Sequence, residues 1–266
     1  MYSLDFVRPA SLAEAVAALQ ADDALPLGGG QTLIPALRQR LAMPGRVVAL
    51  AALPELVGLR IEGGEIRIRG ATCHARIAAE APLPALARLA ARIGDPAVRN
   101  RGTIGGSLVN NDPAACWPAA ALALGAVIRA RGAGGAREIP ADAWFRGLFE
   151  TDLRAGEILT EVRFPLPLAA AYARFRQPAS GFALAGVFVA RFATEVRVAV
   201  TGASAAGVYR WTEAEQLLAD DFTPEALTPL TVSAEGMITD VAAPAAYRAH
   251  LVRVMAGRAV AQAAGG

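Results

Sequence analysis

The chain has 266 residues, enough for one large domain or two smaller ones, and we expect two. With 54% hydrophobic and 19% charged residues, its composition is that of an ordered globular protein rather than a disordered one. The formal net charge is only +2 and the basic residues are scattered, so no nucleic-acid partner is expected.

Cysteine and histidine are scarce. Cys73 and Cys116 form no CxxC pair and are accompanied by only His74 and His250, so this chain alone supplies neither an iron–sulfur cluster nor a zinc site. The N-terminus lacks the basic flank and apolar stretch of a secretory signal, and the alanine-rich run 119–128 is too short to span a bilayer. These features predict a cytoplasmic, soluble protein with no membrane span.

The first half of the chain alternates helix and strand patterns. Ser11–Leu19 predicts a helix, because Leu12, Val16 and Leu19 share one face and Ser11 can cap its start. The elements expected next are a strand at 25–27, a glycine loop, a helix over 33–41, a strand at 47–50, a half-exposed strand at 66–69 after a turn at Gly63–Gly64, helices at 83–93 and 119–124, and strands at 126–130 and 158–164.

Pro165–Pro167 is the best candidate linker. Beyond it, strands are expected at 171–175, 187–192 and 195–200, followed by helices at 212–218 and 245–263. Strands first and helices later predict an α+β second domain.

Two glycine-rich segments are candidates for chemistry. The first comprises Gly28, Gly29, Gly30, Gln31 and Thr32, between a predicted strand and a predicted helix. There, bare backbone can approach a phosphate and aim N–H groups at it, although a lone glycine triplet is more often a tight turn. The spacing is not GxGxxG, so a Rossmann NAD site is not indicated.

The second segment comprises Thr103, Ile104, Gly105, Gly106 and Ser107, which we interpret as another glycine loop, flanked by polar residues including Asn110, Asn111 and Asp112. Taken alone it is more often a turn than a ligand site. Paired with the first segment, it predicts a non-Rossmann cradle for the diphosphate of a dinucleotide.

These motifs carry a family resemblance. The runs 27–35, 93–108 and 111–115 resemble the FAD-binding medium subunit of the xanthine dehydrogenase and carbon monoxide dehydrogenase (molybdenum hydroxylase) family. The similarity continues through 157–162, 172–175 and 246–251, so it covers nearly the whole chain.

The resemblance implies an α+β fold. Residues 1–165 would form a two-lobed FAD-binding domain of the PCMH (vanillyl-alcohol-oxidase-like) type, with an N-terminal lobe over about 1–55 and a central lobe over about 56–165. Residues 170–266 would form the small C-terminal domain of the carbon monoxide dehydrogenase flavoprotein type, with an antiparallel sheet.

The resemblance also implies where non-covalent FAD would bind. Both glycine segments would hold the diphosphate, Asn111 and Asp112 would lie beside the sugar hydroxyls, and Ile93 and Leu159 would pack near the rings. Arg176 matches a basic position that contacts the cofactor in relatives. Phe182 matches a tyrosine near the flavin ring, with an ordinary core phenylalanine as the alternative.

Two positions depart from the family pattern. Gln31 replaces a histidine and keeps the capacity to hydrogen-bond. Cys116 replaces an aspartate that bonds to a flavin sugar hydroxyl. The absence of this aspartate removes a charge-assisted bond of roughly 1.5–3 kcal/mol, which weakens FAD binding about ten- to a hundredfold. Cys116 is interpreted as an inert buried thiol rather than a redox-active one, and His74 as a capping or core histidine.

The resulting hypothesis is an oxidoreductase subunit without catalytic side chains of its own. It would take electrons from 2Fe-2S clusters of a small partner subunit and pass them from FAD to NAD, dioxygen or another acceptor, while a large molybdopterin subunit oxidises the substrate. A dimer of such heterotrimers is expected. The alternatives are a stand-alone flavin oxidase and a degenerate structural subunit that lacks FAD.

Overall fold

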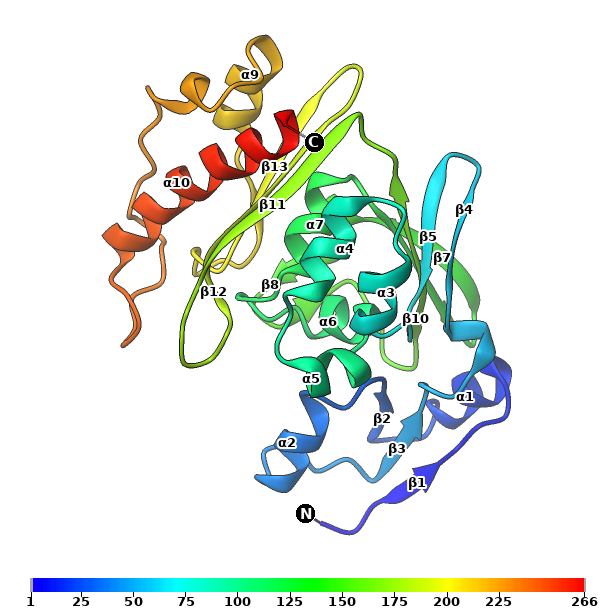
Figure 1. Ribbon diagram of the computed structural model, residues 1–266. Helices are drawn as coiled ribbons and strands as arrows, with labels where there is room; N and C mark the ends of the chain where they lie inside the picture. Colours follow the sequence, from blue (N-terminus) through cyan, green and yellow to red (C-terminus); the bar gives the residue numbers. More distant parts are fainter. Residues whose placement is uncertain (1, 266) are drawn as a thin grey trace.

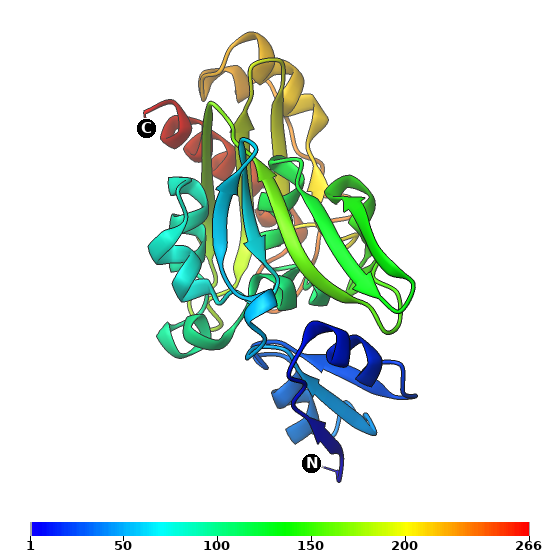
Figure 2. The same ribbon diagram turned by 90° about the vertical axis from the view of Figure 1, so that its right-hand side faces the viewer.

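The structure is a computed structural model that describes residues 2–265. Within these residues the chain forms three main sheets, which follow one another along the sequence (Figures 1 and 2). The N-terminal sheet lies at one end of the molecule, below the larger body that holds the other two sheets.

The N-terminal sheet is parallel, with strand order β1-β3-β2. Its elements are β1 (Asp5–Val7), α1 (Leu12–Ala18), β2 (Ala24–Leu27), α2 (Leu33–Arg38) and β3 (Arg46–Ala49), followed by the short helix η1 (Pro54–Leu56). The predicted cap of α1 is confirmed, because the Ser11 hydroxyl accepts a hydrogen bond from the Glu14 amide at 3.2 Å.

The central sheet is antiparallel, with order β4-β5-β10-β6-β7. Its strands are β4 (Leu59–Glu62), β5 (Glu65–Arg69), β6 (Val127–Gly132), β7 (Gly135–Pro140) and β10 (Ile158–Pro165). Helices lie on one of its faces (Figures 1 and 2): α3 (His74–Glu80), α4 (Pro84–Ala91), α5 (Pro96–Arg101), α6 (Ile104–Asn110) and α7 (Trp117–Ala123). The short helix α8 (Ala141–Trp144) and a ribbon of β8 (Phe145–Gly147) and β9 (Glu150–Thr151) complete this part.

The third sheet is also antiparallel and comprises β11 (Ala169–Arg176), β12 (Ala183–Arg191), β13 (Val196–Thr201) and β14 (Tyr209–Arg210) in that order. The helices α9 (Thr212–Asp220), η2 (Glu225–Leu227) and α10 (Ala245–Ala264) come after it. Helix α10, red in Figure 1, packs across β11 and β12. Strands first and helices later, as predicted, make this part α+β.

Helix α7 joins the central and third sheets. All seven of its residues are buried, and it packs against β12 and β13. Alanine favours helix, and Pro118 is tolerated because it lies in the first turn. One hydrophobic core therefore runs from the central sheet through α7 into one face of the third sheet, whose other face packs on α10. The division into two domains near residue 165 stays a prediction.

The segment after Thr103 differs from the predicted loop, because it forms the first turn of α6. The Thr103 hydroxyl caps this helix by accepting from the Gly106 amide at 3.1 Å. A Cβ on Gly105 would lie only 2.5 Å from the Gly70 carbonyl oxygen, so the helix can approach that strand end only with glycine there.

Candidate functional site

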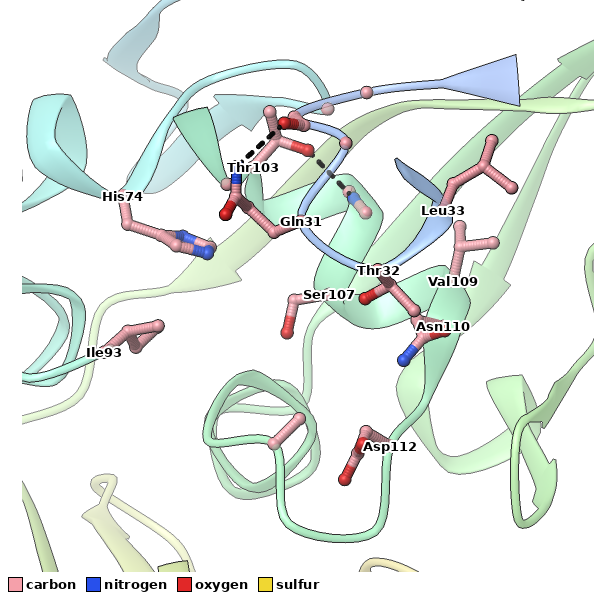
Figure 3. Close-up of a pocket in the computed structure, with 18 of the residues that line it drawn as sticks. Gln31, Thr32, Leu33, His74, Ile93, Thr103, Ser107, Val109, Asn110 and Asp112 are labelled. Carbon is pink, nitrogen blue, oxygen red and sulfur yellow. Dashed lines mark hydrogen bonds between the residues drawn. The ribbon is translucent and has the colours of Figure 1, made fainter. Parts of the chain in front are cut away.

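A cavity of about 630 Å³ lies where the N-terminal sheet, the helical layer and the β11–β12 connection meet (Figure 3). Its volume falls within the range of small-molecule and cofactor sites, roughly 300–1,000 Å³. The residues singled out from the sequence that line it are Gly28, Gly29, Gly30, Gln31, Thr32, Ile93, Thr103, Gly105, Gly106, Ser107, Asp112, Cys116, Leu159 and Phe182. Three others, Ile104, Asn111 and Arg176, lie outside this lining.

The two glycine segments converge, as the sequence hypothesis requires. A Cβ on Gly28 would lie 3.0 Å from the Thr103 hydroxyl oxygen. A Cβ on Gly29 would lie 2.5 Å from the carbonyl carbon of Arg101 and 2.6 Å from Cα of Gly102. Glycine is therefore needed at position 29, because any side chain would separate the two segments.

Most of the free backbone donors belong to the first segment. Among the described residues, none accepts a hydrogen bond from the amides of residues 28–32. In the second segment the amides of Ile104 and Gly105 donate to the carbonyls of Thr72 and Gly70, and the Gly106 amide is taken by Thr103. The first segment can thus hold an anion through its N–H groups, whereas the second shapes the cavity wall.

Polar side chains from α6 and the turn after it point into the cavity. Ser107, Asn110 and Asp112 do so in Figure 3. Asn111 does not, because it adopts a left-handed conformation at the end of α6 (φ 43°) and its side-chain amide donates to the Gly147 carbonyl at 2.7 Å. Residues 107, 110 and 112 therefore offer the hydroxyl, amide and carboxylate that a sugar would meet.

A guanidinium that the sequence analysis missed lies beside the thiol of Cys116. Arg174 lines the cavity, and its Nη1 donates to the Cys116 sulfur at 3.2 Å; its Nη2 donates to the Arg92 carbonyl. Cys116 is buried, as predicted, but it has a cation next to it that its sequence neighbours did not reveal. Burial raises the pKa of the nearby Tyr172 phenol well above its usual value, so that hydroxyl stays neutral.

Arg176 is exposed and lies outside the cavity lining. The pairing of β11 with β12 shifts between Phe175 and Arg176, so the regular alternation of side chains breaks there. Arg174, on the regular side of this bulge, is the arginine whose side chain lines the cavity.

The apolar residues occupy different parts of the wall. Ile93 and Leu159 line the cavity, whereas Ile104 is fully buried in the core. Phe182 lines the cavity with 51% of its surface exposed, so the alternative of an ordinary core phenylalanine is wrong. It follows Gly181, which adopts a left-handed conformation (φ 76°) near the end of the β11–β12 connection.

His74 is a core histidine, as predicted, but it also lines the cavity. Its Nδ1 accepts a hydrogen bond from Nε1 of Trp117 at 3.2 Å. Burial lowers the pKa of His74 to about 4, and the positive charge of Arg99 contributes to the same shift to a smaller extent. Local sequence patterns do not reveal this pairing, because the two residues lie 43 positions apart.

The donor set fits FAD. Unpaired amides on the first glycine segment suit a diphosphate, the polar groups at 107, 110 and 112 suit sugar hydroxyls, and the apolar wall at 93 and 159 suits a ring. The departure is Cys116, where a thiol beside Arg174 offers no carboxylate acceptor. The fold and the cavity thus define a dinucleotide-binding flavoprotein of non-Rossmann type.

Comparison with known proteins gives the family. A family profile described as the FAD binding domain in molybdopterin dehydrogenase matches residues 2–167. The chain belongs to this family, and FAD is its cofactor.

Two relatives match over nearly the full length. The chain is 34% identical to the carbon monoxide dehydrogenase medium chain of Afipia carboxidovorans, over 98% of this chain and 96% of that protein. It is 33% identical to the nicotine 6-hydroxylase medium subunit of Paenarthrobacter nicotinovorans, over 98% and 97%. Its structure is similar to that of reconstituted CO dehydrogenase from Oligotropha carboxidovorans, with a TM-score of 0.92 and 32% identity over 99% and 98% of the chains. The α+β fold class is thereby confirmed.

The part of the chain that the structure describes contains no helix long and apolar enough to cross a membrane. Over the same residues, no group of three or more His, Cys, Asp or Glu side chains is placed to hold a metal ion.

Proposed function

We propose that this chain is the electron-transferring flavin subunit of a heterotrimeric molybdenum hydroxylase. It would receive electrons from 2Fe-2S clusters of a small subunit and pass them to NAD, dioxygen or another acceptor, while a large molybdopterin subunit oxidises the substrate. The observation that carries the proposal is the full-length similarity to medium chains of multi-subunit oxidoreductases, joined to a cavity whose donors suit FAD.

Within this proposal the chain's residues position the cofactor. FAD, when bound, supplies the reversible redox chemistry. The amides of residues 28–32 hold the diphosphate, because they have no acceptor within the described chain. Asn110 and Asp112 bind sugar hydroxyls, and Ile93 and Leu159 exclude water from the ring.

Phe182 and Arg174 lie on the third-sheet side of the cavity. The half-exposed Phe182 places one part of the wall in contact with solvent, which suits delivery of electrons to an acceptor outside the chain. Arg174 supplies a fixed positive charge at the cavity wall, which favours anionic forms of a bound ligand.

The proposal is tested on the purified complex of this chain with its small and large partners. The flavin content is measured against iron and molybdenum, and substrate-driven bleaching of the iron–sulfur and flavin absorbance is followed by stopped flow. We expect about one FAD per chain, iron–sulfur bleaching before or together with flavin bleaching, and acceptor reduction that is lost when FAD is removed and restored when it is added back.

A complex with fully loaded metal centres but no flavin would contradict the proposal. Acceptor reduction that is unchanged without FAD would do the same. Rapid oxidation of an organic substrate by the isolated chain with FAD would instead support a stand-alone flavin oxidase. The arrangement as a dimer of heterotrimers and the cytoplasmic location stay predictions.

A further inference from the structure

The imidazole of His74 is a polar ring in the cavity wall. His74, the first residue of α3, has only 4% of its surface exposed, and its main-chain amide is fixed by the Gly102 carbonyl at 2.9 Å. The imidazole is therefore part of the wall and not a mobile surface group.

Trp117 determines where the imidazole carries its proton. The indole Nε1–H can only donate, and it points at Nδ1 of His74 at 3.2 Å, so Nδ1 is the acceptor and bears no hydrogen. Trp117 is fully buried at the start of α7 and packs against Phe164 with ring centroids 6.5 Å apart, which holds the donor in place. In the neutral ring the hydrogen then lies on Nε2.

The ring stays neutral near physiological pH, because burial and the charge of Arg99 favour the uncharged form. His74 is thus a donor without a net charge. This neutral donor can approach either an anionic or an uncharged acceptor.

The Nε2 edge faces the cavity without a partner. Among the described residues, none accepts a hydrogen bond from His74 Nε2, although both His74 and Gly102 line the cavity. A Cβ on Gly102 would lie 3.0 Å from Nε2, so the glycine leaves this edge uncovered. Figure 3 shows the ring directed towards the space between Ile93 and Ser107.

We propose that His74 donates a hydrogen bond from Nε2–H to bound FAD, and that Trp117 is the positioning residue that fixes the donating tautomer. The inference depends on FAD occupying this cavity. The His74 side chain is nine-tenths buried and its Nε2–H has no acceptor among the described residues, so a ligand in the cavity can accept from it. FAD carries oxygen and ring-nitrogen acceptors along its whole length. His74 then adds a side-chain donor to the backbone donors of the first glycine segment.

Nitrogen NMR of the full chain labelled with ¹⁵N-histidine tests the tautomer directly. The chain has only two histidines, and the exposed His250 on α10 serves as an internal reference that a His250→Gln variant assigns. We expect an unprotonated Nδ1 and a protonated Nε2 at His74. Adding FAD should shift the Nε2–H signal and slow its exchange with solvent, with His250 unchanged.

Variants test whether the donor matters for binding. His74→Phe alone would leave the Trp117 indole without an acceptor, so it is combined with Trp117→Phe, which removes both partners together. We expect this pair of changes to raise the Kd for FAD about five- to tenfold, the loss of one neutral hydrogen bond. His74→Gln keeps an acceptor and an N–H donor, and should stay within about twofold of the wild type.

Trp117→Phe alone separates positioning from direct contact. It leaves the imidazole in place but no longer fixes its tautomer, so the NMR signals should report both tautomers. The FAD affinity should fall by about twofold, because about half of the rings would then lack the Nε2–H donor. A purely structural tryptophan would lower the melting temperature without changing the tautomer.

The proposal is overturned if wild-type His74 carries its proton on Nδ1, or if its Nε2–H signal does not respond to saturating FAD. Equal FAD affinity of the wild type and a folded double variant would also overturn it. Uptake of FAD by the wild type is measured first, so a failure of the cofactor assignment is distinguished from a failure of the His74 assignment.

Discussion

Replacing Gly29 with alanine tests the convergence of the two glycine segments. The new Cβ would lie 2.5 Å from the carbonyl carbon of Arg101 and 2.6 Å from Cα of Gly102. Carbon atoms pack at about 3.5–4.0 Å, so the two backbones must separate by at least about 1 Å. Both neighbours are main-chain atoms, so no side chain can rotate away to relieve the contact.

Overpacking of this kind costs about 1–3 kcal/mol. Gly29 and Gly30 are buried whereas Gln31 and Thr32 are exposed, so we expect residues 28–32 to shift towards the cavity, carrying their unpaired amides away from the diphosphate position. If the loop must return to its original place to bind FAD, the free energy of FAD binding becomes less favourable by the same amount. The Kd for FAD should then rise about five- to 150-fold.

Flavin fluorescence during titration of the apoprotein measures the Kd, and thermal unfolding measures stability. Gly45→Ala is the matched control, because its Cβ would meet only the Asp23 side chain at 3.9 Å. Gly28→Ala should fall between the two, since its Cβ would press on the Thr103 hydroxyl at 3.0 Å. Wild-type affinity in a folded Gly29→Ala protein would refute the reasoning.

Three further predictions concern the side chains of Cys116, Arg248 and His74. Cys116→Asp places a carboxylate beside Arg174 and should tighten FAD binding about ten- to a hundredfold by adding a charge-assisted bond, as measured by the Kd. Arg248→Met removes a buried guanidinium that donates to the carbonyls of Leu184 and Gly202 at 2.9 and 2.8 Å; it should lower the free energy of unfolding by about 2–4 kcal/mol in urea titrations. The pKa of His74 is about 4 in the fold against 6.5 normally, so the unfolded chain binds the extra proton between these values. Stability should therefore fall by about 2 kcal/mol from pH 7 to pH 5, as followed by unfolding at each pH.

Each of these predictions has its own control. Cys116→Ser changes size and polarity without adding charge, so equal tightening by serine and aspartate would contradict the electrostatic reason. Arg248→Lys keeps the charge and one donor and should lose less stability than the methionine variant. For the pH dependence, His74→Gln should flatten the difference between pH 7 and pH 5, and an unchanged slope in that variant would assign the effect to other groups.

Local sequence rules account for many elements. The Ser11 cap, the alanine-rich α7 and the change from strands to helices after residue 200 all follow from spacing and propensity. The start of α6 does not, because Gly105 and Gly106 weaken helix propensity. That turn is held by the Thr103 cap and by the close approach of Gly70.

The same division applies to the site. The sequence by itself identified the two bare-backbone segments and the polar run after α6, because glycine and short polar residues act through local backbone geometry. Only the tertiary structure decided which polar groups face the cavity. Asn111 turns away at a left-handed residue, and the bulge after Phe175 leaves Arg174 inside and Arg176 outside.

The pairing of His74 with Trp117 and that of Cys116 with Arg174 join residues 43 and 58 positions apart. Local residue spacing cannot predict either pair, because each contact depends on how α7 packs between the central and third sheets. The chain's composition and motifs thus determined that a dinucleotide could be held, and the packing of α7 determined which side chains would meet it.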